Sequence, residues 1–523
     1  MSEHTSASRY WVPAYVLCGV VAATAGYYVV DRKPLLIVAG VALGLLALAA
    51  SFRLEGSQGL FIALLSIFAF TIPMSGVRVS QTTALSDVIM LPLIALVFLM
   101  TVRTKDTVVP EMKPLMIGGA LISACGVASS FTAADVTLAL FGAFRVFVAT
   151  VLLPWAIGTI RLTTPLARLM TWAWMAGLVI SCVLGFVHFK TPFGRVLGLT
   201  THENHFGLTA VFGVGVALAL YLSEKGFLRY VAFGCLAITA YGVIESGSRA
   251  SLLGMVLAAG IFVLRTRRSI FLLWGWLAIV VSFAVLVTGI VQLPEYNALA
   301  RLFGGGNASV EIADDVRAEA HEWAVEKIDR NPLFGGGFDE AEIVHNVYLQ
   351  IWASAGLLAL ASFLLVMVAA ARPAIAPKVL HPDASQPWDR RALLSLGYSV
   401  GCIGYFLIAT TSNIFWTRYV WFQMAMAIAL SSRRYADVPL PRRAQSTGGE
   451  WPTTETALAA ASWPITETTR QNSSAPMSSS QKSSALVSSA QSEPALVRAG
   501  QPQHTVMSAN TGEPLNLEVV QRP

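Results

Sequence analysis

The residues best suited to chemistry in this sequence are three arginines and a histidine, widely spaced along the chain: Arg195, Arg249, Arg317 and His345. Arginine is permanently charged and presents a fork of donors that suits phosphate oxygens. Two or three arginines around a membrane-level cavity therefore suit a pyrophosphate-bearing lipid. A histidine with a pKa near neutrality can take a proton from a hydroxyl nucleophile. Together these groups favour glycosyl transfer from a polyprenyl diphosphate.

Four polar residues near this set are the supporting candidates: Asn204, Glu245, Asn346 and Tyr348. Glu245 precedes Arg249 by four residues, across a Ser-Gly-Ser turn, so it either pairs with that arginine or orients it. The other three stand close to Arg195 or His345 in the sequence.

Other polar residues compete with these assignments. His202 and His205 rival His345 as a base on chemistry alone, and they otherwise line the cavity or hydrogen-bond the backbone. Arg145 and Asp87 belong to apolar stretches, where a charge is costly and is a functional candidate by default. For these two, snorkelling or helix pairing is at least as good an explanation as catalysis.

The composition identifies the environment in which these residues must act. Of 523 residues, 55% are hydrophobic and 13% are charged, whereas ordinary globular domains are roughly a quarter charged. This balance excludes a soluble enzyme and predicts an all-α polytopic membrane protein. The net charge of +6 fits a loop bias toward the cytoplasmic face, since no dense basic run marks a nucleic-acid surface.

Hydropathy predicts about 12 to 14 transmembrane helices, each an apolar stretch of roughly the length that crosses a bilayer. The fourteen candidate spans are 11–30, 35–52, 60–74, 85–102, 115–131, 136–160, 169–189, 206–222, 231–244, 251–264, 270–291, 347–371, 393–411 and 414–430. With both termini inside, eighteen Lys and Arg lie on the cytoplasmic side and eleven on the external side. We therefore predict a transmembrane domain over 1–434 with both ends cytoplasmic.

One long external loop, 292–346, lies between two of these spans. Apolar residues at helical spacing predict an interfacial or lid-like helix over Val310 to Asp329, which Asn331 and Pro332 end. Under this topology the candidate arginines, the histidines and the Ser-Gly-Ser turn all lie on the external side. That common location is the main evidence from the residues for a site.

The remaining features indicate no metal, no cofactor and no targeting peptide. The loop's acidic residues have no spacing typical of metal ligands, so arginine would replace the metal that soluble sugar-nucleotide transferases often use. The five cysteines all lie in apolar stretches and fit small buried residues. Residues 435–523, rich in Ser, Thr, Ala, Gln and Pro, are predicted to be a disordered cytoplasmic tail.

An ordered set of motifs resembles the O-antigen ligase and Wzy-type polysaccharide polymerase superfamily over about residues 136–431. The matching pieces are the Arg195 loop leading to Asn204, the Ser246 to Ala250 turn, the Arg317 to Trp323 spacing, Asn331 to Gly335 with Gly337, and His345-Asn346 with Tyr348. The sequence departs from the commonest pattern in having Ala250 after the arginine, where Gly is frequent. The interval from Gly337 to His345 is also compact.

The resemblance implies metal-independent, inverting transfer of a glycan from an undecaprenyl diphosphate carrier, on the external (periplasmic) face of the bacterial cytoplasmic membrane. By position, Arg195 and Arg249 would contact the diphosphate, and His345 would be the base or orient the acceptor. Arg317 would either touch phosphate or anchor the loop helix. The implied partners are an undecaprenyl-diphosphate-linked glycan, an acceptor glycan or lipid, membrane lipids and other polysaccharide assembly proteins, with no nucleic acid.

Two questions stay open in the sequence. A polymerase, whose acceptor is another lipid-linked repeat unit, and a ligase, whose acceptor is lipid A core or another surface acceptor, fit equally well. The alternative from another class is a flippase or secondary transporter of a lipid-linked or anionic solute. A transporter should place its charged residues near mid-membrane on broken helices, whereas most of these candidates are predicted at the external boundary.

Overall fold

The computed structural model describes residues 57–78, 84–104, 108–160, 162–266, 297–302, 307–338, 344–376 and 389–432. The predicted spans 11–30, 35–52 and 270–291 and the predicted tail 435–523 lie outside the described residues. The chain divides into two units, Met1–Arg442 and Arg443–Pro523, and every described residue belongs to the first.

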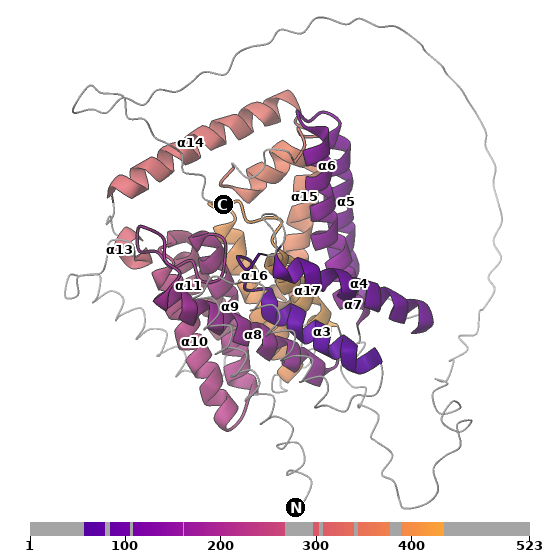
Figure 1. Ribbon diagram of the computed structural model, residues 1–523, viewed down its shortest axis with the longest axis vertical. Coiled ribbons are helices and arrows are strands. Elements are labelled where there is room, and N and C mark those ends of the chain that lie inside the picture. The colour runs from indigo at the N-terminus through magenta and orange to yellow at the C-terminus, as the bar shows by residue number, and fades with distance from the viewer. Residues whose placement is uncertain are drawn as a thin grey trace, which may run out of the picture. The chain divides into compact units, whose positions relative to one another are not determined.

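The described residues form helices, as predicted for an all-α protein (Figure 1). The two β-bridges among them, Arg78 with Ala84 and Lys190 with Val196, are isolated. The elements are α3 (Ser57–Thr71), α4 (Leu85–Thr104), η1 (Pro110–Met112), α5 (Lys113–Ser130), α6 (Val136–Phe147), η2 (Val148–Leu152), α7 (Leu153–Thr159), α8 (Thr164–Val187), α9 (Glu203–Ser223), α10 (Phe227–Glu245), α11 (Arg249–Thr266), α13 (Ala298–Leu302), α14 (Asn307–Arg330), α15 (Val347–Ile375), α16 (Arg390–Ile408) and α17 (Arg418–Ser431).

Within this part of the chain, nine helical stretches are long and apolar enough to cross a membrane. The predicted multi-pass membrane class is therefore confirmed. One of the nine, Val136–Thr159, is a continuous helical stretch made of α6, the π-helical turn η2 and α7. The predicted last span, 414–430, is shorter than expected: α17 has 14 residues, against about 20 for a full crossing. Its side chains are nonetheless buried almost throughout.

The centre of the described bundle is formed by α9 and α16, which lie side by side and are the most buried of the nine (Figure 1). Glycines bring these two helices into close contact. A Cβ at Gly215 would come within 2.5 Å of the Gly397 carbonyl oxygen, and a Cβ at Gly397 within 2.6 Å of the Gly215 oxygen. In a bilayer, the lipid is as apolar as the side chains, and small residues allow helices to pack closely against each other.

The α15 helix is broken near its start, unlike the uninterrupted span predicted at 347–371. Gly356 has φ +82° and ψ 178°, so the helix stops and restarts there. The loop after α14 fills the break, because Leu357 N–H donates to the Pro332 carbonyl at 3.1 Å and Trp352 Nε1 donates to the same oxygen at 2.9 Å. These hydrogen bonds connect the loop that precedes His345 to α15, the helix that follows His345.

The α14 helix covers the residues for which a helix was predicted in this loop, and it lies across the end of the bundle where α11 and α15 begin (Figure 1). It packs against the first part of α15 through a small apolar cluster of Ala324, Ile328, Val344 and Ala353. The Nζ of Lys327 lies 4.4 Å above the Trp323 ring. These contacts fix α14, and with it Arg317, over the segment that carries His345.

Candidate active site

Arg195 lies in the loop between α8 and α9, and its guanidinium joins three segments. Its Nε donates to the Ser246 carbonyl at 2.9 Å, its Nη2 donates to Asn204 Oδ1 at 3.1 Å, and its Nη1 pairs with Glu203. Both Asn204 and Glu203 belong to the first turn of α9. Asn204, a predicted supporting residue, thus contacts Arg195 directly and orients its guanidinium.

The Arg195 loop is built so that this side chain points inward. Thr191 and Arg195 bond across the loop, with Thr191 N–H to the Arg195 carbonyl at 2.7 Å and Arg195 N–H to Thr191 Oγ1 at 3.1 Å. Gly194 has φ +80°, which closes this tight turn. Burial lowers the pKa of Arg195 to about 10, opposed by Glu203 and reinforced by Arg301 and Arg317. The guanidinium therefore stays charged at neutral pH and has two further arginines within electrostatic range.

The turn between α10 and α11 carries Glu245 and Arg249. Glu245 is buried; its backbone carbonyl accepts from Val196 N–H at 3.0 Å, and its Oε1 accepts from Asn297 Nδ2 at 3.3 Å. Arg249 is the first residue of α11 and is half-buried. Glu245 therefore holds the Arg195 loop and the Asn297 segment against the turn that presents Arg249.

Arg301 is a site residue that the sequence did not single out. It lies on the short helix α13, is 8% exposed, and donates from Nη1 to the Gly247 carbonyl at 2.8 Å. Arg195 and Arg301 thus bind two consecutive carbonyls of the same turn, those of Ser246 and Gly247. The signal available in the sequence was an arginine in the apolar run from Ala298 to Leu302, which needs a partner if it is buried.

His345 lies just before α15, and the two supporting residues beside it fix the start of that helix. Asn346 is the N-cap, and its Oδ1 accepts from the backbone N–H of Tyr348 at 2.9 Å and of Leu349 at 3.1 Å. The Tyr348 hydroxyl donates to the Phe406 carbonyl of α16 at 2.8 Å. Both predicted residues therefore hold the backbone that carries His345.

The pKa of His345 is below its usual value of about 6.5. Burial is the main cause, and the charges of Arg317 and His202 add to it. His345 is consequently neutral at neutral pH, the form that can accept a proton. The same effects place Arg317 and His202 within electrostatic range of His345.

Of the two rival histidines, His202 belongs to this group. Its Nδ1 accepts from Asn204 N–H at 3.1 Å, which caps α9, and lies 3.5 Å from Glu203 Oε2. Burial lowers the pKa of His202, opposed by Glu203 and reinforced by Arg195 and Arg317. His205 lies one turn further into α9, with its ring centre 5.9 Å from that of His202.

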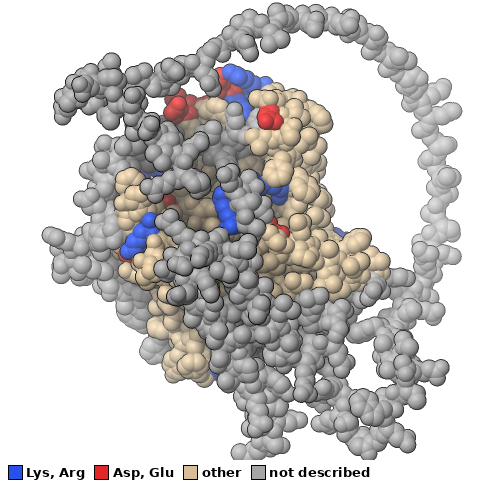
Figure 2. Space-filling view, viewed as in Figure 1, with Lys and Arg blue, Asp and Glu red and all other residues tan. Residues whose placement is uncertain are grey.

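Arg317, half-buried on α14, is the residue that connects the group. Its charge lowers the pKa of Arg195, His202 and His345 alike, so it lies within electrostatic range of all three. Figure 2 shows Lys and Arg side chains in the middle of the face below α14. The structure thus brings three of the four predicted principal residues into one electrostatic group, and it places Arg249 beside the turn that Arg195 and Arg301 bind.

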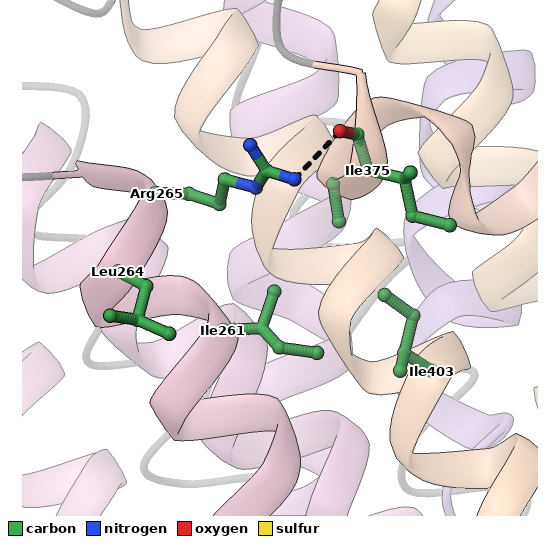
Figure 3. Close-up of a pocket in the computed structure, with 6 residues that line it drawn as sticks. Ile261, Leu264, Arg265, Ile375 and Ile403 are labelled. Carbon is green, nitrogen blue, oxygen red and sulfur yellow. Dashed lines mark hydrogen bonds between the residues drawn. The ribbon is translucent and has the colours of Figure 1, made fainter.

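A cavity of about 250 Å³ lies elsewhere, near the opposite ends of α11 and α15. Its lining is apolar apart from Arg265, whose Nη2 donates to the Ile375 carbonyl at 2.7 Å (Figure 3). Arg249 and His345 stand at the other ends of these helices, and none of the predicted site residues lines the cavity. The cavity is therefore separate from the candidate active site.

The fold and this group of residues define a multi-pass helical membrane protein with a cationic, histidine-containing site at one end of its helices. Residues 234–364 match the family described as O-antigen ligase. The chain is thus similar to that family over the segment from α10 to α15, which confirms the resemblance stated from the motifs. The match includes Glu245, Arg249, Arg317 and His345, whereas Arg195 precedes it. No match was found among curated proteins.

Proposed function

We propose that the protein transfers a glycan from an undecaprenyl diphosphate carrier to an acceptor hydroxyl, with inversion and without a metal. The observation that carries this proposal is that Arg301 and Arg317 lie within electrostatic range of Arg195, and that Arg317 also lies within electrostatic range of a neutral His345. A concentration of fixed positive charge beside a proton acceptor suits a reaction in which a diphosphate departs as an acceptor hydroxyl attacks.

The proposed step follows from these groups. His345 takes the proton of the acceptor hydroxyl while that oxygen bonds to the anomeric carbon of the donor glycan. The bond from that carbon to the diphosphate breaks, and the diphosphate leaves with the electron pair. Arg195, Arg249 and Arg317 bind the diphosphate and offset its charge, and Arg301 strengthens the same field. Glu203 and Asn204 keep the Arg195 guanidinium oriented before substrate arrives.

We place this reaction at the external face of the bacterial cytoplasmic membrane, with both termini on the cytoplasmic side. The partners under this proposal are the lipid-linked donor, an acceptor glycan or lipid, the bilayer lipids and other polysaccharide assembly proteins. A cysteine introduced at Asn307 should react from outside with an impermeant reagent in intact cells. Protection at that position would contradict the orientation.

Reconstitution of the full chain with a defined undecaprenyl diphosphate oligosaccharide tests the proposal. A ladder of products indicates a polymerase, and transfer to an added glycolipid acceptor indicates a ligase. Activity that survives chelation supports a metal-independent step, whereas loss reversed by a divalent cation would contradict it. Movement of the lipid-linked donor across the bilayer without any turnover would point instead to a transporter.

A further inference from the structure

An uncharged run of residues, 331–338, follows α14 and leads toward His345. Its sequence is Asn-Pro-Leu-Phe-Gly-Gly-Gly-Phe. Leu333 and Phe334 are 60% and 67% exposed, although both side chains are large and apolar. On α14 itself, by contrast, most of the exposed residues are charged. Two adjacent apolar side chains gain free energy when an apolar partner removes them from water, so this pair indicates a covered surface.

Backbone contacts hold Leu333 and Phe334 beside the break in α15. A Cβ at Gly356 would meet the Leu333 carbonyl and would come within 2.7 Å of the Phe334 nitrogen. Gly336 N–H donates to the Ala353 carbonyl at 2.8 Å, one turn before the break. The two exposed side chains are therefore fixed at one level along α15 rather than carried on a free loop.

The part of α15 that follows the break is long enough to cross a bilayer by itself. It runs from Leu357 to Ile375, which at about 1.5 Å per residue is ~28 Å, close to the roughly 30 Å of a hydrocarbon core. Arg372, exposed in the last turn, suits the head-group region at the far end. Gly356 and the loop beside it therefore lie at the other boundary of the hydrocarbon, at the end of the bundle that carries the candidate active site.

The exposed pair continues the lipid-facing side of this span. Large apolar residues at helical spacing are exposed along one side of α15: Leu357, Leu358, Leu364, Leu365 and Val368. Phe131, at the end of α5, is also exposed, and its neighbour Thr132 donates from Oγ1 to the Gly335 carbonyl at 3.4 Å. Leu333 and Phe334 thus belong to one apolar surface with two membrane spans.

The residues on the α14 side of this pair are those that suit a lipid head-group region. Lys327 and Arg330 are in the last turn of α14, and the Trp352 indole donates to the Pro332 carbonyl. Lys and Arg side chains extend toward head groups, and Trp is enriched at membrane interfaces. The order of basic, aromatic and apolar side chains matches the edge of a bilayer and favours lipid over a protein partner.

We propose that Leu333 and Phe334 insert into the bilayer and anchor the C-terminal end of α14 to it. The partner is the lipid surface: acyl chains cover the two side chains, and lipid head groups lie beside Lys327 and Arg330. Because α14 carries Arg317, and the loop leads to His345, this anchor holds the candidate active site at the level of the lipid head groups. The anchor does not depend on which reaction the site carries out.

Site-directed spin labelling of the full chain in liposomes tests the anchor. The label is attached to Phe334→Cys in a chain whose five native cysteines are replaced by alanine. Val325→Cys, on the exposed side of α14, is the water-facing control, and Leu364→Cys, on the exposed side of α15, is the lipid-facing control. Oxygen concentrates in hydrocarbon and a nickel chelate concentrates in water. The ratio of oxygen to chelate accessibility at position 334 should therefore approach the ratio at 364 and lie well above the ratio at 325.

Two results would overturn the anchor. A ratio at position 334 equal to that at 325 would show that the side chain faces water. Low accessibility to both reagents at position 334 would show that protein covers the patch, either a second copy of the chain or another partner. Thermal unfolding of each labelled chain checks that its fold is intact.

Photolabelling keeps the anchor testable without any substitution. The unmodified full chain is reconstituted with a phospholipid that carries a diazirine in its acyl chain, irradiated, digested and analysed by mass spectrometry. Adducts should appear on the peptide that contains Leu333 and Phe334 and on α15 peptides from Leu357 onward, and the exposed side of α14 should carry none. Labelled α15 peptides together with an unlabelled Leu333 and Phe334 peptide would contradict the anchor.

Discussion

Arg195 donates its Nε hydrogen to the carbonyl oxygen of Ser246 at 2.9 Å, which makes the loop before α9 and the turn between α10 and α11 one structural unit. The same turn presents Arg249 at the start of α11. Arg195, which was predicted to bind phosphate, therefore also supports the turn that presents Arg249. Substitutions at Arg195 should report both roles.

Arg195→Lys should lower kcat/KM for glycan transfer at least about tenfold although the charge is kept, because lysine cannot reach Ser246 and Asn204 together. The measurement is steady-state kinetics with the lipid-linked donor. The matched control is Arg229→Lys, since Arg229 is exposed and stacks on Tyr221, 4.5 Å from the ring centre. Equal losses in both variants would mean that the effect is not specific to the site.

Much of the candidate site could be predicted because its elements are local. Hydropathy located the helices, and the predicted topology placed Arg195, Arg317 and His345 on one side of the membrane. What the sequence could not provide is contact between distant segments. Arg301 is a site residue only because α13 docks on Gly247, 54 positions away. The break at Gly356 exists because the Pro332 loop inserts there, and that stretch is otherwise an ordinary apolar span.

The pH dependence of transfer should show an acid limb below about pH 6.5. Burial lowers the pKa of His345, so the base stays neutral and competent to lower pH than a free histidine, and activity falls as pH drops through that pKa. The measurement is kcat/KM against pH, with His345→Ala expected to abolish transfer. If His345→Ala keeps activity and His202→Ala loses it, the base is His202.

Gly356→Ala should destabilise the protein and reduce transfer. The residue has φ +82°, which disfavours any side chain, and a Cβ there would come within 2.0 Å of the Leu333 carbonyl oxygen. Backbone strain alone is worth roughly 1–3 kcal/mol, and displacement of the Pro332 loop would move the segment that carries His345. The measurement is thermal unfolding together with transfer rate. Gly260→Ala is the control, because a Cβ there meets nothing within 4 Å.

Glu224→Gln should reduce stability without acting on the chemistry. Glu224 lies at the other end of α9 and is buried, and its carboxylate accepts from Arg168 at 2.5 and 2.7 Å and from Trp172 Nε1 at 3.2 Å. Removing one member of a buried ion pair costs about 3–5 kcal/mol, and partial exposure of Arg168 reduces this figure. The unfolding midpoint should fall, while the folded fraction keeps the wild-type KM for donor. A large rise in donor KM would contradict a purely structural role.

Arg317→Gln separates the two roles that the sequence left open for this arginine. Its charge lowers the pKa of His345 and His202, so its removal should raise the pKa of His345 and shift the acid limb of the pH profile to higher pH. If Arg317 also binds the diphosphate, donor KM should rise at the same time. An anchor for α14 would instead lower stability through the packing of that helix on α15, with the donor KM unchanged in the enzyme that remains folded. Because α14 packs through Ala324 and Ile328, the control Val325→Ala, on the exposed side, should leave both the limb and the KM unchanged.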